Sequence, residues 1–169
     1  MTPAEISHRV FRALSMRVER AGLLGSDTVP SPNLLPTPRL WVYATARVDP
    51  SRYLAAADGL AAGRLDVFAL RNVDLGSPPR WNRDPRTGVE APLVFGKLLD
   101  YRDPQRVGDI KYLWEVNRHL HLPTLAQAYA LSGNVRYFNV IRQHLESWFA
   151  ECPYRMGLTG RARSRRRSG

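Results

Sequence analysis

The chain has 169 residues, of which 44% are hydrophobic, and this suffices for one modest core in a single domain or a piece of a larger one. The single cysteine, Cys152, excludes an internal disulfide and, with no neighbouring histidine or aspartate, is typical of a buried or neutral thiol. The formal net charge is +10, but five arginines lie in the last nine residues and the rest of the chain carries only +5. Such a mildly positive charge on the rest of the chain suits an anionic partner and is equally ordinary for a protein surface. No apolar run approaches the length of a membrane span.

Residues 1–22 predict an amphipathic N-terminal helix, with Thr2 as its N-cap and Pro3 in its first position. The apolar face comprises Ile6, Val10, Phe11, Leu14 and Val18. Charged residues recur throughout the segment and exclude a signal peptide, so the chain as it stands is expected in the cytoplasm, while the localisation of the protein is left unknown. We expect this helix to pack on its own domain, and a basic helix lying on a membrane surface is the alternative.

Residues 23–64 combine a proline-rich loop with a short helix. Proline, glycine and serine recur between Leu23 and Pro50, which predicts an extended loop or linker in which Trp41-Val42-Tyr43 suits a short strand. The alanine-rich residues 53–62 predict a short helix that is closed by Gly63. Alternation of apolar and polar side chains in residues 65–75 then predicts one or two short strands.

Residues 77–92 contain four prolines and one glycine and predict a loop. Within it, an indole lies beside an amide and a guanidinium, at Trp81, Asn82 and Arg83. Sugar-binding sites combine such groups, because pyranose rings stack on aromatic faces while Asn and Arg bind hydroxyl and carboxylate groups. These three residues are therefore candidates for binding a sugar. In the alternative interpretation Trp81 anchors the loop to the core and Arg83 pairs with Asp84.

Three runs of helical periodicity follow in residues 100–148. The first predicts a helix that Pro123 ends or kinks, with a face formed by Ile110, Leu113, Trp114, Asn117 and His121. The second ends at Ser132-Gly133, and Asn134 suits the N-cap of the third helix. Because the link between them is so short, the second and third helices must lie antiparallel. The stripe of the third helix comprises Phe138, Ile141, Leu145, Trp148 and Phe149.

Four polar residues interrupt the first of these helices, at Asn117, Arg118, His119 and His121. Unpaired buried polar groups cost about 1–3 kcal/mol each, so these side chains need partners from the fold, a metal or a ligand. Two positions apart, the histidines point about 200° from each other on a helix, which argues against a shared metal ion. We expect Asn117, Arg118 and His121 to face a cleft, with His119 packed and hydrogen-bonded outward. A purely structural network is the alternative.

Four motifs occur in a fixed order: WNRDP-x-TG at 81–88, FGK-x-LDYRDP at 95–104, GDIKY-x-WE-x-NRH-x-HL at 108–122 and TLAQAYAL-x-G at 124–133. Together they resemble the N-terminal helical domain of the heparinase II/III-like polysaccharide lyases. The resemblance extends over residues 65–158.

The resemblance implies a mainly α fold, namely the N-terminal portion of a partial α/α toroid with a small β element. It also implies an acidic polysaccharide on the concave face, and a second half of the toroid and a β-sandwich domain that this chain lacks. Family members cleave by β-elimination, in which a base removes the proton at C5 of a uronic acid. The family's catalytic Asn, Tyr and His follow the point that corresponds to Leu158. We therefore assign no catalytic residue, cofactor or metal to this chain, and the substrate-binding candidates are Trp81, Asn82, Arg83, Asn117, Arg118 and His121.

Residues 159–169 form a basic tail that departs from the family pattern after Leu158. In one coding of this tail, inserting a single base yields Leu-Asn-Trp-Ala-Ser-Ser-Leu-Glu, which restores that pattern. A frameshift or truncated gene model is therefore the preferred interpretation. A functional tail for nucleic acid or anionic lipid is the alternative.

The predicted function is that of an N-terminal fragment of a heparinase II/III-like lyase, inactive by itself, that binds acidic polysaccharide and no nucleic acid. A non-catalytic polysaccharide-binding module and a helical scaffold for protein partners are the alternatives.

Overall fold

The computed structural model describes residues 2–21, 23, 48–153 and 156–158. The chain divides into two units, Met1–Arg39 and Leu40–Gly169. The first contributes helix α1, and the second, called the body below, contributes all other described helices and strands. The predicted strand at Trp41-Val42-Tyr43 and the tail at 159–169 lie outside the described residues. Among the helices of the described ranges, none is both long and apolar enough to cross a bilayer.

Helix α1 (Pro3–Arg20) begins where its capping residues predict. The Thr2 hydroxyl accepts a hydrogen bond from the Glu5 backbone N–H at 3.4 Å, and Pro3 occupies the first turn, where no intrahelical N–H is needed. Glu5 in the first turn and Arg20 in the last complement the helix dipole. The prediction of an N-terminal helix is confirmed, and none of its residues is buried.

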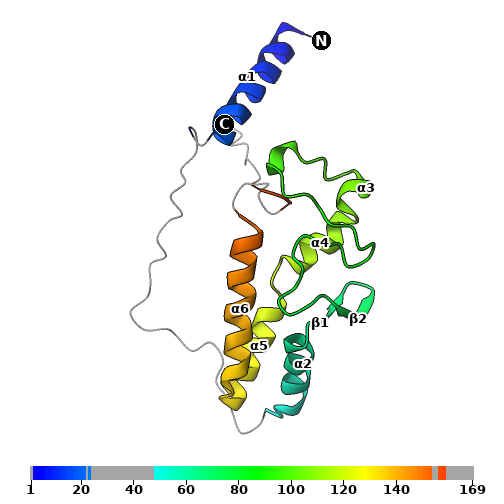
Figure 1. Cartoon of the computed structure of the whole chain (residues 1–169), viewed down its shortest axis with the longest axis vertical. Coiled ribbons are helices and arrows are strands. Elements are labelled where there is room, and N and C mark those ends of the chain that lie inside the picture. Colours follow the sequence, from blue (N-terminus) through cyan, green and yellow to red (C-terminus); the bar gives the residue numbers. More distant parts are fainter. Residues whose placement is uncertain (1, 22, 24–47, 154–155, 159–169) are drawn as a thin grey trace. The chain divides into compact units, whose positions relative to one another are not determined.

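The body is mainly helical, with one small two-stranded antiparallel sheet (Figure 1). Its elements in chain order are α2 (Ser51–Ala61), β1 (Arg64–Val67), β2 (Leu70–Asp74), the 3-10 helix η1 (Gly96–Leu98), α3 (Pro104–Val107), α4 (Ile110–Val116), α5 (His121–Ser132) and α6 (Val135–Glu151). The expected short helix and strands are thus confirmed, whereas most of the predicted proline-rich loop lies outside the described residues. The partial α/α toroid remains a prediction.

Helices α5 and α6 form an antiparallel hairpin, and α2 packs beside α5 (Figure 1). Gly133 ends α5 with a φ of 69°, in the left-handed region that glycine adopts without steric cost. The Asn134 side chain then caps α6 by accepting from the Arg136 backbone N–H at 3.0 Å. These helices share a core cluster of Ala57, Leu125, Ala128, Tyr137 and Val140. Both the stop and the cap read from the sequence are confirmed.

The first predicted helix is shorter than expected. Helix α4 ends at Val116, and α5 begins only at His121, so the prediction that Asn117 and His121 share one helix face is wrong. The break lies at His119, whose φ of 57° cannot continue a right-handed helix. Pro123 does not end a helix, because it lies in the first turn of α5, where its missing N–H costs nothing.

The buried side of α6 also differs from the predicted stripe. The buried residues of α6 are Tyr137, Val140 and His144, whereas Phe138 and Phe149 are 49% and 68% exposed. The predicted stripe was chosen from the largest apolar side chains of the helix. The observed face is displaced around the helix because α6 receives both α5 and Trp81 from the loop at 77–92.

Candidate functional site

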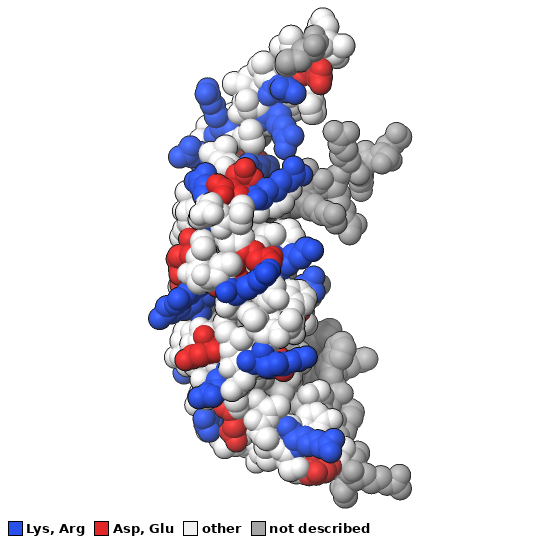
Figure 2. Space-filling view, turned by 90° about the vertical axis from the view of Figure 1, so that its right-hand side faces the viewer, with Lys and Arg blue, Asp and Glu red and all other residues white. Residues whose placement is uncertain are grey.

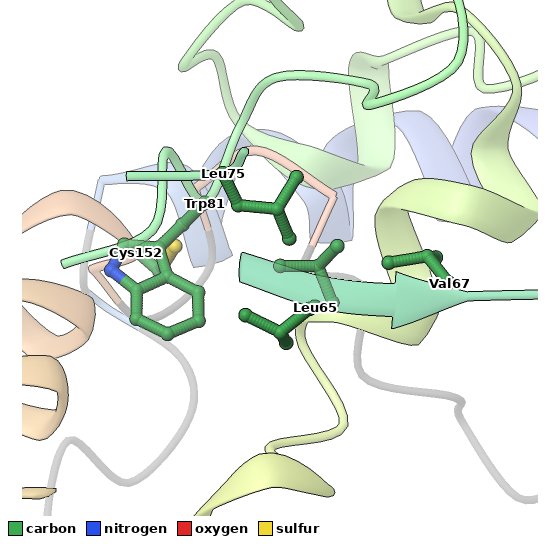
Figure 3. Close-up of a cluster of buried hydrophobic side chains, with 6 residues drawn as sticks. Leu65, Val67, Leu75, Trp81 and Cys152 are labelled. Carbon is green, nitrogen blue, oxygen red and sulfur yellow. The ribbon is translucent and has the colours of Figure 1, made fainter. Parts of the chain in front are cut away.

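The loop at 77–92 is fastened to the body by Trp81, whose side chain is fully buried. Its indole packs in a core cluster with Leu65, Leu75 and Cys152 (Figure 3). The indole Nε1–H donates to the Ser147 hydroxyl on α6 at 3.0 Å, and this hydroxyl donates to the Glu151 carboxylate. With no exposed face, the Trp81 ring packs in the core in this structure and is not available for stacking on a sugar.

The other candidates in this loop have different environments. Asn82 donates from Nδ2 to the Glu151 carbonyl at 3.1 Å, close to the C-terminal end of α6. Arg83 is exposed and pairs through its backbone with Glu90 in an isolated β-bridge. The Asp84 carboxylate is fully buried and accepts from the backbone N–H groups of Arg86 and Asp109 at 2.9 and 2.6 Å. Asp84 therefore joins this loop to the start of α4.

Asn117 lies at the C-terminal end of α4, where both the nitrogen and the oxygen of its side-chain amide form hydrogen bonds. Its Nδ2 donates to the carbonyls of Trp81 and Leu113, each at 2.9 Å, and its Oδ1 accepts from the Trp148 indole at 2.9 Å. The Cys152 thiol also points to this oxygen, at 3.9 Å. Asn117 thus connects the loop, α4 and α6, as the structural alternative of the sequence analysis describes.

Three histidines surround Trp81. His119 lies edge-on to both Trp81 and Trp148, with ring centroids 5.2 and 4.9 Å away. The expected outward hydrogen bond of His119 is absent, since its buried ring nitrogens have no partner among the described residues. His121 Nε2 lies 3.2 Å from His144 Nδ1, and His144 Nε2 lies 3.1 Å from the Ser77 hydroxyl. This chain of polar groups links α5, α6 and the loop.

These histidines are held neutral. Burial is the main cause that lowers the pKa of His121 to about 3, with smaller effects of the nearby His144 and His119. Burial, followed by His119, lowers the pKa of His144 to about 4. Burial also lowers the pKa of His119. Since neither His121 nor His144 carries an extra proton near neutral pH, one ring donates and the other accepts in the bond between them.

A groove of about 470 Å³ opens between α2, the β1–β2 hairpin and the turn from α4 to α5. Its apolar wall includes Leu60, Leu65 and Val116, and its polar lining includes Arg64, Asn72, Glu115, His121 and Thr124. On α2 the wall is formed by Ala55, Ala56 and Gly59 beside Leu60, and a Cβ atom at Gly59 would meet nothing within 4 Å. The groove is therefore open on the side of α2.

The charges at the groove leave a positive excess. The two acidic residues of the lining are each neutralised by an arginine, Asp66 by Arg71 at 2.9 Å and Glu115 by Arg118 at 3.0 Å. Arg64 adds a further positive charge at the lining, and the Arg118 side chain is 63% exposed. On the face shown in Figure 2, basic and acidic side chains are interspersed and form no continuous patch of one sign.

Of the six predicted site residues, only His121 lines this groove, and Arg118 reaches it through Glu115. Trp81 and Asn82 each bond to α6, Asn117 bonds to the Trp81 carbonyl, and Arg83 lies in the exposed part of the loop. Arg64, Asn72 and Glu115 also line the groove and were not predicted from the sequence. Glu115 had a readable signal, because it precedes Arg118 by three helical positions and suits an ion pair. The hairpin residues had none, since their place at the groove depends on tertiary packing.

Within the described ranges, no group of three or more His, Cys, Asp and Glu side chains is arranged to hold a metal ion. No family model, curated protein or solved structure matches this chain.

Proposed function

We propose that the body is the N-terminal helical part of a heparinase II/III-like polysaccharide lyase, and that its groove binds an acidic polysaccharide. The order of the four sequence motifs supports the family assignment. The observation that supports the binding site is the groove itself, with an arginine in its lining and a second arginine at its edge.

The polar and charged groups of the groove suit a uronate-containing chain. Guanidinium groups bind carboxylates with two parallel hydrogen bonds, and Arg64 and Arg118 supply such groups. The Arg118–Glu115 ion pair is exposed on its arginine side, whereas Oε2 of Glu115 is buried. A sugar carboxylate can bind the guanidinium N–H groups of Arg118 that do not face Glu115, so that the ion pair is kept. Asn72, Thr124 and the neutral His121 offer partners for hydroxyl groups.

The groove is assigned binding and not proton abstraction. β-Elimination requires a base with a pKa close to the working pH. His121 lines the groove, but its pKa of about 3 makes its imidazole a weak base at neutral pH. The chemical step of a complete lyase then belongs to groups outside this groove.

The test of this proposal is the variant Arg118→Ala, assayed for binding to heparin and alginate oligosaccharides alongside its unfolding midpoint. Loss of a hydrogen bond to a charged group is expected to weaken binding by about 1.5–3 kcal/mol. The affinity is compared on the folded protein, because the buried Oε2 of Glu115 loses its partner in this variant and stability should fall as well. Arg142→Ala is the matched control, because Arg142 is similarly exposed, at 64%, and pairs with Glu146 on α6. A large loss of stability with unchanged affinity of the folded protein would contradict the proposal.

A second candidate, a helical scaffold that binds a protein, is favoured by exposed apolar side chains on the α5–α6 hairpin. Tyr129, Val135 and Phe138 are 41%, 58% and 49% exposed, and the rings of Tyr129 and Phe138 lie 5.9 Å apart. A complex that forms without glycan and is lost in Phe138→Ser would support the scaffold. Glycan binding that survives this substitution would support the polysaccharide proposal.

A further inference from the structure

Helix α1 presents an apolar face that the described residues of its unit leave uncovered. Ile6, Val10, Phe11 and Leu14 are 48%, 53%, 71% and 53% exposed, and together with Pro3 and Ser7 they line a shallow groove along the helix. Exposed side chains of this size on one side of a helix mark a surface that contacts an apolar phase or a partner. The proposed polysaccharide site uses none of these residues.

The charged residues of α1 are distributed unevenly around this face. At about 100° per residue, the apolar residues from Ile6 to Phe11 span an arc of about 140°. Arg17 lies within this arc, close to the end marked by Ile6. Arg9 and Arg20 lie outside the arc beyond the same end, and about 20° separates these two arginines. Glu5 lies nearly opposite the centre of the arc. The Ile6 side of the apolar face therefore carries arginines, the Phe11 side carries Ser15 and His8, and both carboxylates, Glu5 and Glu19, lie farther from the face.

This distribution matches an anionic membrane surface. A helix in the interfacial plane buries its apolar face at the level of the upper acyl chains, and arginines at its boundary extend their guanidinium groups to the lipid phosphates. Negatively charged lipids attract such boundary arginines, while the carboxylates on the opposite side remain in water.

A second copy of α1 fits the same face less well. In an antiparallel pair the two arginine edges would meet, which places like charges side by side. In a parallel pair the arginine edge would meet the Ser15 and His8 edge, where the nearest carboxylate, Glu19, lies about 80° beyond Phe11 and so outside the apolar contact. Neither arrangement pairs Arg9, Arg17 and Arg20.

We propose that α1 is a membrane-surface helix that binds the headgroup region of anionic phospholipid bilayers. The probe is the full chain mixed with vesicles of phosphatidylcholine, with or without phosphatidylserine, and the readout is co-sedimentation at increasing salt. We expect binding that requires phosphatidylserine and weakens as salt rises. Arg9→Gln and Arg20→Gln should each weaken this binding about fivefold, as expected for one arginine near an anionic surface.

Two further variants complete the test. Phe11→Ser combined with Leu14→Ser should abolish vesicle binding, and Arg12→Gln, on the side that faces water, should change it less than about twofold. The arginine variants keep the apolar face intact, so they remain informative if the serine variant loses its helix. Equal binding to both vesicle types would overturn the proposal. A failure to bind vesicles would also overturn the proposal. If the protein is then a dimer that the serine variant loses, the apolar face contacts a second copy. If the serine variant instead has a lower unfolding midpoint, the face packs on the body.

Discussion

Asp84 and Gly108 meet at a point where two segments distant in sequence come into close contact. The Asp84 carboxylate accepts from the Thr87 hydroxyl and from the backbone N–H of Asp109, and Arg86 pairs with the Asp109 carboxylate at 2.9 Å. A Cβ at Gly108 would lie 2.4 Å from an Asp84 oxygen, so this position leaves no room for a side chain. Two of the motifs that resemble the lyase family thus contact each other here and have a structural role.

Replacing Gly108 by alanine should destabilise the body severely. The added methyl group would clash with the buried carboxylate, and the φ of 67° adds left-handed strain, so we expect a loss of more than about 2 kcal/mol. Gly133→Ala is the control for a positive φ without a contact, because its φ is 69° and its ψ 4°, in the left-handed helical region, and nothing lies within 4 Å of its Cβ. Gly108 combines its φ with a ψ of −148°, a region that is essentially restricted to glycine, and this adds to the cost of Gly108→Ala. Gly133→Ala should cost only the strain of about 1–2 kcal/mol. Equal losses of unfolding free energy in the two variants would show that the Asp84 contact is unimportant.

At the scale of elements, the loop at 77–92 and α5 and α6 are held together by polar contacts. Trp81 reaches Ser147, Asn117 reaches Trp81 and Trp148, and the His121–His144 pair ends at Ser77. Each of these groups needs its partners, because a buried polar group left unpaired costs about 1–3 kcal/mol. The elements are therefore coupled through hydrogen bonds as well as apolar contacts.

The histidine pair predicts that stability falls with acidification. The folded-state pKa values of about 3 and about 4 lie below the usual value of 6.5, so the unfolded chain takes up protons that the folded protein refuses. Stability is complete above pH about 6.5 and declines as pH falls towards about 4, by at most about 1.4 kcal/mol per pH unit for each histidine. Denaturant unfolding at several pH values measures this slope.

His144→Gln should flatten the slope, even though the variant is less stable at neutral pH. His8→Gln, at an exposed position on α1, should leave the slope as it is. Stability that stays constant between pH about 6.5 and about 4.5 would show that these histidines are not held neutral.

Local signals predicted much of the secondary structure. Thr2, Gly133 and Asn134 mark helix ends because capping depends on neighbouring residues alone. The helix break at His119 was not predicted, because no sequence pattern indicates a histidine with a left-handed backbone conformation. The end of the helix was instead predicted at Pro123, which lies in the first turn of α5.

The candidate site was harder to predict, because its contacts join residues far apart in the chain. The indole of Trp81 bonds to a residue 66 positions away, and nothing in the WNRDP motif indicates whether the ring is buried or exposed. For the same reason, the sequence did not show which side of α6 is buried or that His144 lies on that side. The polar residues 117–121 were identified as unusual, but whether they bind a ligand or one another is decided by tertiary packing.

At the scale of the whole molecule, the chain should bind uronates without cleaving them. Because the histidine that lines the groove is a weak base, the purified chain should produce no unsaturated uronate from heparin, heparan sulfate or alginate. The ultraviolet absorbance of the unsaturated product gives the measurement. Any turnover that exceeds that of a heat-denatured sample would refute the assignment of binding alone.

The most direct test of the account is to fill the groove from α2 and measure glycan affinity. Gly59→Leu should fold at least as well as the parent, because leucine favours a helix by roughly 1 kcal/mol over glycine and its Cβ meets no neighbour within 4 Å. Its side chain should occupy the groove and weaken binding of heparin or alginate oligosaccharides at least tenfold, while Gly59→Ala changes affinity little. A well-folded Gly59→Leu protein with the affinity of the parent would contradict the account, because the polysaccharide would then bind elsewhere.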